Sequence, residues 1–206
     1  MDDFRLIPMF SVPLYTAFDL DITNEHKETV SIQEFEPTRD QNGFMTRSNQ
    51  ILDIPELVGI KNQVDFHVQK YVLKVFNPTD DIQFYMTASW AMLHFLGNFS
   101  PSHWHVNSII SGILYIDVDD NSGDLVFVNK NSTLYHPQIR IPSKGPTDYN
   151  RTEEYVKPKP NQIVIFPSIL SHAVTVSNSD IERYCIAFNY FIRGKLGNGD
   201  KNLVIL

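Results

Sequence analysis

Between about residue 82 and residue 192, the sequence is divided into short segments of apolar or alternating residues, which Asn, Ser, Gly and Asp separate. No helical pattern lies between these segments. Strands that follow one another without crossover helices pair antiparallel, so this region is predicted to form a β-sandwich or β-barrel rather than a parallel α/β sheet. The predicted strands are residues 82–87, 88–96, 103–109, 111–118, 124–128, 162–167, 171–176 and 183–192.

The N-terminal part of the chain has a different pattern. Residues 4–16 are rich in apolar side chains but contain two prolines, which predicts an edge strand or an extended arm. Residues 24–36 are predicted to form a short helix, and residues 37–50 a polar loop. The clearest helix begins at Pro55, has apolar residues at three- and four-residue steps, and is stopped by Pro78.

We therefore expect residues 1–206 to form a single domain. Residues 1–80 would be the N-terminal arm and helices, and residues 81–195 the β-rich core. One long polar segment, residues 129–161, interrupts the predicted strands and is rich in Pro, Lys, Asn and Thr. Loops of this length inside a compact domain are commonly functional, which suggests a lid that selects substrate.

The composition excludes several classes of protein. The net charge is −7 and no cluster of Lys or Arg stands out, which argues against nucleic acid and anionic membranes as partners. The chain has one cysteine and so no intramolecular disulfide. It has no apolar run of the roughly 18–20 residues that a membrane span needs, and no secretory signal at its acidic N-terminus. We expect a soluble, cytoplasmic protein.

The tripeptide His103-Trp104-His105 is a candidate metal-binding motif. Histidines two residues apart on a strand point to the same face and can offer two imidazoles to one ion. His172, at the start of a later predicted strand, could add a third. The His-x-His spacing alone is common by chance, and imidazole suits iron, zinc, copper and nickel, so these residues do not by themselves identify a metal.

The strand that starts at Arg183 presents two different faces. Its bulky, apolar face is fit for packing and consists of Tyr184, Ile186, Phe188 and Tyr190. Its other face consists of Arg183, Cys185, Ala187 and Asn189. An arginine above two small residues leaves room for an anionic ligand, although an arginine paired with a surface acid is equally compatible with this pattern.

The other histidines have simpler interpretations. His67 lies on the apolar stripe of the long helix and is predicted to be a packing residue. His26 and His136 fall in polar segments and are predicted to be exposed, whereas His94 lies in an alternating strand and could face either way.

Three segments together resemble a known family: SWAMLHFLGNFSPSHWHVNSIISGILYIDV, SGDLVF and QIVIFPSILSHAVTVSNSDIERYCIAFN. They are similar to the small bacterial and phage type of iron(II)/2-oxoglutarate-dependent oxygenase in their order of HxH with Asn-Ser, SGxxY, FPxxxxH, and Arg followed by Asn. The match covers about residues 88–192. The resemblance implies a mainly β protein with N-terminal helices, whose core is a double-stranded β-helix, or jelly roll, with iron(II) at its open end.

The resemblance also implies residue roles. His103 or His105, together with His172, would be iron ligands. Arg183 would bind the far carboxylate of 2-oxoglutarate, and Tyr115 would line the same pocket and donate its hydroxyl to that carboxylate.

The chain departs from the wider superfamily, which uses His-x-Asp or His-x-Glu with a distal histidine. Counted from His103, the place of the acid holds His105; counted from His105, it holds Asn107. Both registers remain open, so Asn107 stays a candidate for metal or cofactor binding. We favour His103, His105 and His172, because imidazole is a better ligand for iron(II) than a neutral amide.

The leading hypothesis is a dioxygenase that uses iron(II), O2 and 2-oxoglutarate, hydroxylates an unidentified substrate, and releases succinate and CO2. It would act in the cytoplasm of a bacterium or of a phage-infected host, and the arm at residues 4–16 could support a homodimer. Two alternatives remain: a cupin-type metalloprotein (a metal dioxygenase, isomerase or sugar binder) that does not use 2-oxoglutarate, and a non-catalytic jelly-roll module.

Overall fold

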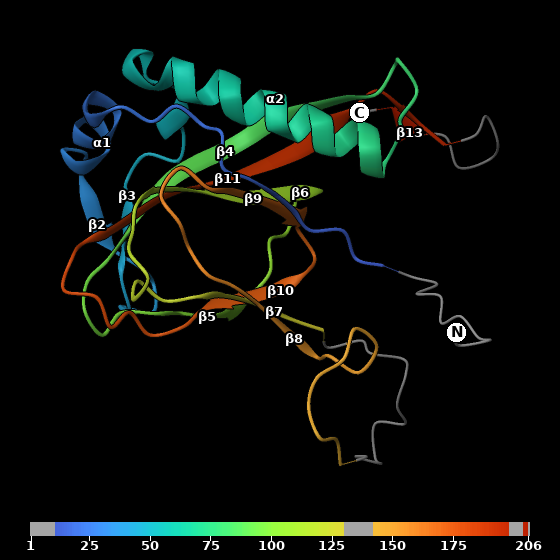
Figure 1. Cartoon of the computed structure of the whole chain (residues 1–206). Coiled ribbons are helices and arrows are strands. Elements are labelled where there is room, and N and C mark those ends of the chain that lie inside the picture. The colour runs from blue at the N-terminus through green and yellow to red at the C-terminus, as the bar shows by residue number, and fades with distance from the viewer. Residues whose placement is uncertain (1–10, 130–141, 198–203, 206) are drawn as a thin grey trace.

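The protein folds into two antiparallel β-sheets that face each other, with its helices on the outer side of the larger sheet (Figure 1). The structure is a computed structural model that describes residues 11–129, 142–197 and 204–205. This arrangement confirms the expected mainly β jelly roll with N-terminal helices.

The larger sheet has the order β1-β9-β6-β11-β4-β3-β2, and the smaller sheet the order β5-β10-β7-β8. The strands of the larger sheet are β1 (Tyr15–Ala17), β2 (Phe35–Pro37), β3 (Phe44–Thr46), β4 (Gln83–His94), β6 (Ile110–Asp117), β9 (Ile163–Pro167) and β11 (Arg183–Arg193). Those of the smaller sheet are β5 (Ser100–His103), β7 (Leu125–Val128), β8 (Glu153–Val156) and β10 (Ser171–Val174). A separate pair consists of β12 (Lys195–Leu196) and β13 (Val204–Ile205).

The central strands of the larger sheet are buried on both faces. Along β6, Ile113 and Tyr115 point between the two sheets, whereas Leu114 and Ile116 belong to the cluster beneath the helices. Successive side chains of a strand point to opposite faces, so one strand serves two cores. The inner core therefore surrounds the space between the sheets. Polar side chains buried there are unfavourable unless they form hydrogen bonds or bind a ligand.

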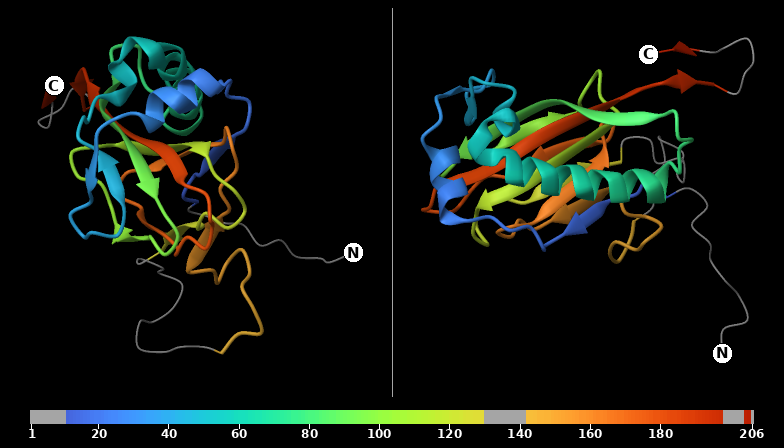
Figure 2. Two further views of the ribbon diagram at one scale, coloured as in Figure 1. Left: turned by 90° about the vertical axis from the view of Figure 1, so that its left-hand side faces the viewer. Right: turned by 90° about the horizontal axis from the view of Figure 1, so that it is seen from above.

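The long helix α2 (Val58–Val75) covers the outer face of the larger sheet (Figure 2). A 3-10 turn, η2 (Pro55–Leu57), leads into it from the neighbouring turn η1 (Ile51–Asp53). Its buried apolar residues recur at helical spacing and join the outer cluster: Ile60, Val64, Val68, Tyr71 and Val72. The predicted helix from Pro55 to the region of Pro78 is thus confirmed.

The shorter helix α1 (Asn24–Ser31) begins where Thr23 forms a capping box with His26. It ends before β2, so the predicted range of residues 24–36 was too long. The predicted loop over residues 37–50 is confirmed except for β3 and for Pro37, which ends β2. Only three residues long, β3 is defined by its pairing with Leu93 and Met92 of β4, a contact between distant segments that leaves no local pattern in the sequence.

Three strand predictions need correction. Residues 82–96 form mainly one strand, β4, rather than two. The predicted strand over residues 103–109 was wrong: β5 ends at His103, and the chain then turns through Asn107, whose φ of 54° lies in the left-handed region that asparagine tolerates. The predicted loop at residues 129–161 contains β8, which pairs with β7. Residues 130–141 of the predicted lid lie outside the described residues.

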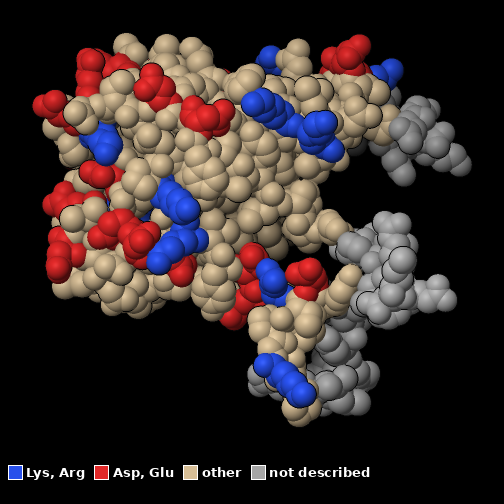
Figure 3. Space-filling view, viewed as in Figure 1, with Lys and Arg blue, Asp and Glu red and all other residues tan. Residues whose placement is uncertain are grey.

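The edge position predicted for the N-terminal arm is borne out where the chain is described, because β1 is the outermost strand of its sheet and pairs with β9 alone. The part of the arm before residue 11 lies outside the described residues. None of the helices in the described chain combines the length and apolar character needed to cross a bilayer. On the face shown in Figure 3, acidic and basic side chains are interspersed rather than separated into large patches.

Candidate metal and anion site

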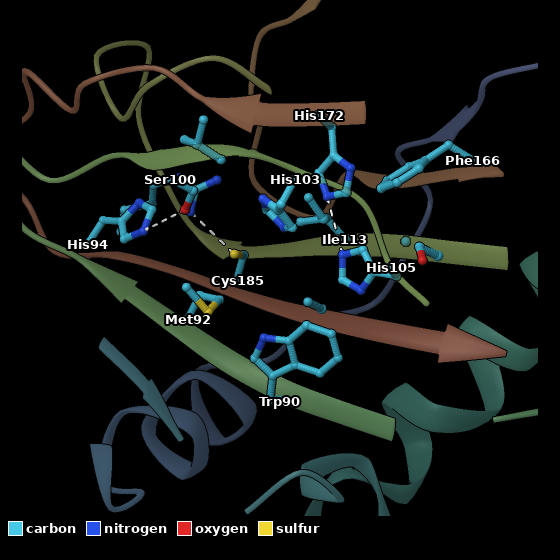
Figure 4. Close-up of a pocket in the computed structure, with 15 residues that line it drawn as sticks. Trp90, Met92, His94, Ser100, His103, His105, Ile113, Phe166, His172 and Cys185 are labelled. Atoms are coloured by element: carbon cyan, nitrogen blue, oxygen red, sulfur yellow. Dashed lines mark hydrogen bonds between the residues drawn. The ribbon is translucent and has the colours of Figure 1, made fainter. Parts of the chain in front are cut away.

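A cavity between the two sheets brings together side chains from six strands (β4, β5, β6, β9, β10 and β11) and from the turn after β5 (Figure 4). At one end lie three histidines, and toward the other lie His94 and Ser100. The lining residues are Trp90, Met92, His94, Ser100, His103, His105, Ser111, Gly112, Ile113, Phe166, His172, Val174, Arg183, Cys185 and Ala187.

His103, His105 and His172 form a cluster in which one ring nitrogen from each residue lies within 4.8 Å of the others. His103 ends β5 and pairs directly with His172 of β10. His105 lies beyond the end of β5, where its backbone N–H donates to the carbonyl oxygen of Ser168 at 3.0 Å. The two histidines of the motif therefore converge through a turn and not, as predicted, through the alternation of one strand.

The ring orientations suit a shared cation. The Nδ1–H of His103 donates to the Pro101 carbonyl at 2.8 Å, and the Nδ1–H of His172 to the Leu170 carbonyl at 3.0 Å. In a neutral imidazole, a proton on Nδ1 leaves Nε2 unprotonated and free to bind a metal. The Nε2 atoms of His105 and His172 lie 3.3 Å apart. Two imidazole nitrogens bound to one ion at about 2.1 Å, with angles near 90–110°, lie about 3.0–3.5 Å apart.

Burial keeps two of these histidines neutral, which is the form that binds a metal. Desolvation lowers the pKa of His172 to about 3, although the hydrogen bond to Leu170 acts in the opposite direction. Desolvation likewise lowers the pKa of His105 to about 4. Trp90 stacks against His105 at 5.7 Å between ring centroids, and Phe166 packs edge-on against His172 at 4.8 Å. These aromatic contacts fix both rings in place.

Deeper between the sheets, Arg183 is 1% exposed and has no acidic partner among the described residues. Its Nη1 contacts the Cys185 sulfur at 3.3 Å, but its Nε and Nη2 atoms have no hydrogen-bond partner within the described chain. A buried, unpaired charge is strongly unfavourable. An anion that enters from outside the protein could neutralise this charge.

The other buried polar atoms without a partner in the described chain are the Tyr115 hydroxyl and His94 Nδ1. Both adjoin Arg183: its guanidinium lies 5.3 Å from the Tyr115 ring centroid, and His94 is its partner in the β11–β4 ladder. All four unpaired atoms therefore belong to three neighbouring residues. The oxygens of a carboxylate could accept hydrogen bonds from several of them at once.

The protonation states of this group suit an anion. Burial raises the pKa of Tyr115 above the ordinary value for tyrosine, so its hydroxyl stays a donor. Burial, and then the charge of Arg183, lowers the pKa of His94 to about 3, so its ring is neutral near pH 7. Arg183 is thus the one charged side chain among the described residues that line this end of the cavity.

Most of the side chains proposed from the sequence come together. Arg183, Cys185 and Ala187 line the cavity, as the alternation along β11 predicted, and Asn189 contacts His105. Asn107 differs from the others, because it is exposed in the turn after β5 and is not among the residues that line the cavity.

Sequence reasoning missed the contributions of Trp90, Ser100 and His94. The alternation of Trp90, Met92 and His94 along β4 was visible, but which face of that strand lines the cavity depends on its pairing with β11. His67, by contrast, is a core residue as predicted: it is 3% exposed, and its Nδ1 bonds to the Tyr15 hydroxyl at 2.7 Å.

Comparisons with known proteins place this geometry in context. A family model described as "Putative 2OG-Fe(II) oxygenase" matches residues 88–189, a span that contains all three clustered histidines and Arg183. A search of curated proteins finds no match to the sequence.

Several solved structures share the fold. A Burkholderia pseudomallei oxidoreductase of the 2OG-Fe(II) oxygenase family aligns with a TM-score of 0.55 at 14% identity, over 80% of this chain and 74% of that one. HygX from Streptomyces hygroscopicus, solved with nickel and 2-oxoglutarate bound, aligns with a TM-score of 0.60 at 9% identity. The alignment covers 87% of this chain and 82% of HygX. A Pseudomonas putida prolyl-4-hydroxylase aligns with a TM-score of 0.57 at 15% identity, and the alignment covers 89% of this chain and 95% of the hydroxylase. At these identities the likeness concerns the fold.

Proposed function

This chain belongs to the 2OG-Fe(II) oxygenase family, and we propose that it hydroxylates an organic substrate while converting 2-oxoglutarate and O2 to succinate and CO2. As a member of that family it is an oxidoreductase that uses iron(II) and 2-oxoglutarate. The hydroxylation and the residue roles below are our proposal.

The observation that carries the proposal is the unpaired guanidinium of Arg183, buried in the same cavity as three converging imidazoles. A metal site alone gives no reason for a buried cation at its inner end. A dicarboxylate that reaches from the metal to Arg183 satisfies both ends. This feature favours the oxygenase over a cupin that does not use 2-oxoglutarate.

In the proposed site, the Nε2 atoms of His103, His105 and His172 hold iron(II). Three neutral ligands leave the charge of the ion uncompensated, so an anionic co-substrate binds more favourably there than beside a carboxylate ligand. Arg183 neutralises the far carboxylate, and Tyr115 donates a hydrogen bond to it. The charges of the co-substrate are thereby balanced at both ends.

Iron(II), when bound with O2 and 2-oxoglutarate, supplies the oxidising power that inserts one oxygen atom into a C–H bond and the other into succinate. The protein's own contribution is position and exclusion of water. Trp90 and Phe166 hold the rings of His105 and His172, and the apolar side chain of Ile113 lines the cavity between its two ends. His94 is a third group for the far carboxylate, since it is neutral and its Nδ1 is unpartnered.

The direct test is succinate formation by the iron-loaded protein supplied with 2-oxoglutarate and O2. We expect slow turnover without substrate, faster turnover when a metabolite panel includes the substrate, and a product heavier by one oxygen atom. At 2-oxoglutarate concentrations that saturate the wild type, Arg183→Met should release far less succinate, whereas Arg193→Met, at the exposed end of the same strand, should release as much as the wild type. Failure of the iron-loaded wild type to bind 2-oxoglutarate would reject the proposal.

A further inference from the structure

The third imidazole of the cluster is oriented differently from the other two. Nδ1 of His103 and Nδ1 of His172 face backbone carbonyls, but Nδ1 of His105 faces the side-chain amide of Asn189, at 3.1 Å. An amide can either accept or donate. If its oxygen faces His105, Nδ1 carries the proton and Nε2 is free for a metal. If its nitrogen faces His105, the proton sits on Nε2, where it donates to Nε2 of His172 at 3.3 Å and blocks the metal.

As placed, Nδ2 of Asn189 faces His105 and Oδ1 faces Ser111. A carboxamide occupies nearly the same volume when it is turned end for end, so its hydrogen-bond partners decide its orientation. The partner on the far side of Asn189 is the Ser111 hydroxyl, at 2.7 Å. The question therefore becomes whether Ser111 donates or accepts.

Ser111 belongs to a continuous chain of hydroxyls, which we call the serine relay (Ser111, Ser168 and Ser108). Ser111 Oγ lies 2.8 Å from Ser168 Oγ, which lies 2.7 Å from Ser108 Oγ. Ser108 Oγ in turn lies 3.0 Å from the carbonyl oxygen of Ile110 and 3.2 Å from that of Tyr190. Ser111 is 1% exposed and Ser168 is fully buried, so bulk water supplies them with no further proton.

Each hydroxyl has one proton to donate, and a carbonyl can only accept. Ser108 therefore gives its proton to a carbonyl and must accept from Ser168. Ser168, having used its proton, must accept from Ser111. Ser111 then has none left for Asn189 and must accept from the amide nitrogen, which turns Oδ1 toward His105. The opposite order would leave the lone pairs of Ser108 facing two carbonyl oxygens without a proton between them.

We propose that Asn189, anchored by the serine relay, is a positioning residue that fixes His105 with its proton on Nδ1 and its Nε2 open to the metal. The inference rests on the proposed role of His105 as a ligand. The cavity-facing side of β11 would then have two functions. Arg183 would bind the anion, and Asn189 would set the tautomer of the proposed metal ligand His105. Groups that orient a ligand histidine typically change metal affinity by about 10–100-fold when removed.

The tautomer can be read directly in the metal-free, 15N-labelled wild-type protein by long-range proton–nitrogen correlation of the imidazoles. The His105 signals are assigned by comparison with His105→Ala. The proposal predicts protonated Nδ1 and unprotonated Nε2 for His105. Observation of a proton on Nε2 of His105 in the metal-free wild type would overturn it. This experiment requires neither activity nor a metal.

Variants test the consequence. Asn189→Leu removes the acceptor and should weaken Co²⁺ binding by about 10–100-fold. Asn189→Asp, whose carboxylate can accept from Nδ1–H, should restore affinity to near that of the wild type. Ser111→Ala should cause a smaller loss in the same direction. Ser122→Ala, which removes a buried hydroxyl hydrogen-bonded to Asp119 at 2.7 Å and not lining the cavity, is the matched control and should leave affinity unchanged.

Two failures can be told apart. If the wild type binds no Co²⁺ or iron(II), the proposed function fails. If the wild type binds metal and Asn189→Leu binds it equally well while remaining folded by circular dichroism, only the positioning role of Asn189 is wrong. Should Asn189→Leu not fold, Ser111→Ala and the wild-type tautomer still decide the matter.

Discussion

The Nε2 atoms of His105 and His172 face each other across 3.3 Å, although the two residues are 67 positions apart in the sequence. With the proton of His105 on Nδ1, as proposed above, both Nε2 atoms are unprotonated, and at this distance they repel each other unless a cation lies between them. The cluster is therefore preorganised for a metal, and its geometry lowers the stability of the metal-free folded state. Metal binding should raise the stability of the folded state, since the unfolded chain offers no such site.

Loss of one clustered histidine should strongly weaken metal binding. We expect His172→Ala to raise the Kd for Co²⁺, measured by calorimetric titration, by about 100-fold or more, because it removes a ligand rather than a supporting group. His26→Gln, at the start of α1, is the control and should bind as the wild type does. Equal affinities for wild type and His172→Ala would exclude this cluster as the metal site.

Arg183→Met should separate stability from co-substrate binding. Without ligand, the variant should be at least as stable to urea as the wild type, because it removes an unpaired buried charge. Its affinity for 2-oxoglutarate should fall by about 30-fold or more. The measurement is the melting temperature of the metal-loaded protein with and without 2-oxoglutarate. Equal stabilisation of both proteins by 2-oxoglutarate would contradict the assignment.

Acid should destabilise the protein through His94. Its pKa is about 3 in the folded state, against 6.5 for the ordinary side chain. Between these values the unfolded chain takes up the proton and the folded state does not, so the free energy of unfolding falls as the pH falls. His94 alone should account for about 3 kcal/mol by pH 4. Urea unfolding across pH 4–7 should show a flatter dependence for His94→Gln, and identical slopes would argue against a neutral, buried His94.

Gly112→Ala should destabilise the fold where β6 pairs with β11, because Gly112 lies opposite Phe188 in that pairing. A Cβ at Gly112 would overlap the ring of Phe188 and lie 2.8 Å from the carbonyl oxygen of Val164. We expect a loss of about 1–3 kcal/mol in urea unfolding. Gly59→Ala is the matched control, because a Cβ at Gly59 in α2 meets nothing within 4 Å and should stabilise the helix by about 0.5–1 kcal/mol. Similar effects of the two substitutions would refute this steric account.

The sequence predicts the architecture well where side-chain periodicity is local. The alternation along β11 separates Arg183 from Tyr184, and the helical spacing of α2 identifies its buried face. In both cases the spacing of apolar residues within a single strand or helix shows which of its faces is buried.

Features that depend on contacts between distant segments could not be predicted. The sequence could not show that His105 lies beyond the end of β5, because the Ser168 carbonyl holds it there. It could not assign His94 to the anion site, because that depends on the ladder between β4 and β11. The serine relay is equally invisible, since Ser111 and Ser168 are 57 residues apart and meet only after β6 and β9 pair.

The most direct test of the account is anaerobic titration of the iron(II)-loaded protein with 2-oxoglutarate, followed by visible absorption. We predict a weak charge-transfer band that saturates below about 1 mM 2-oxoglutarate in the wild type. Arg183→Met should need far higher concentrations, and His172→Ala should give no band. A wild-type protein that binds iron(II) but develops no band would contradict the claim that this cavity holds the metal and 2-oxoglutarate together.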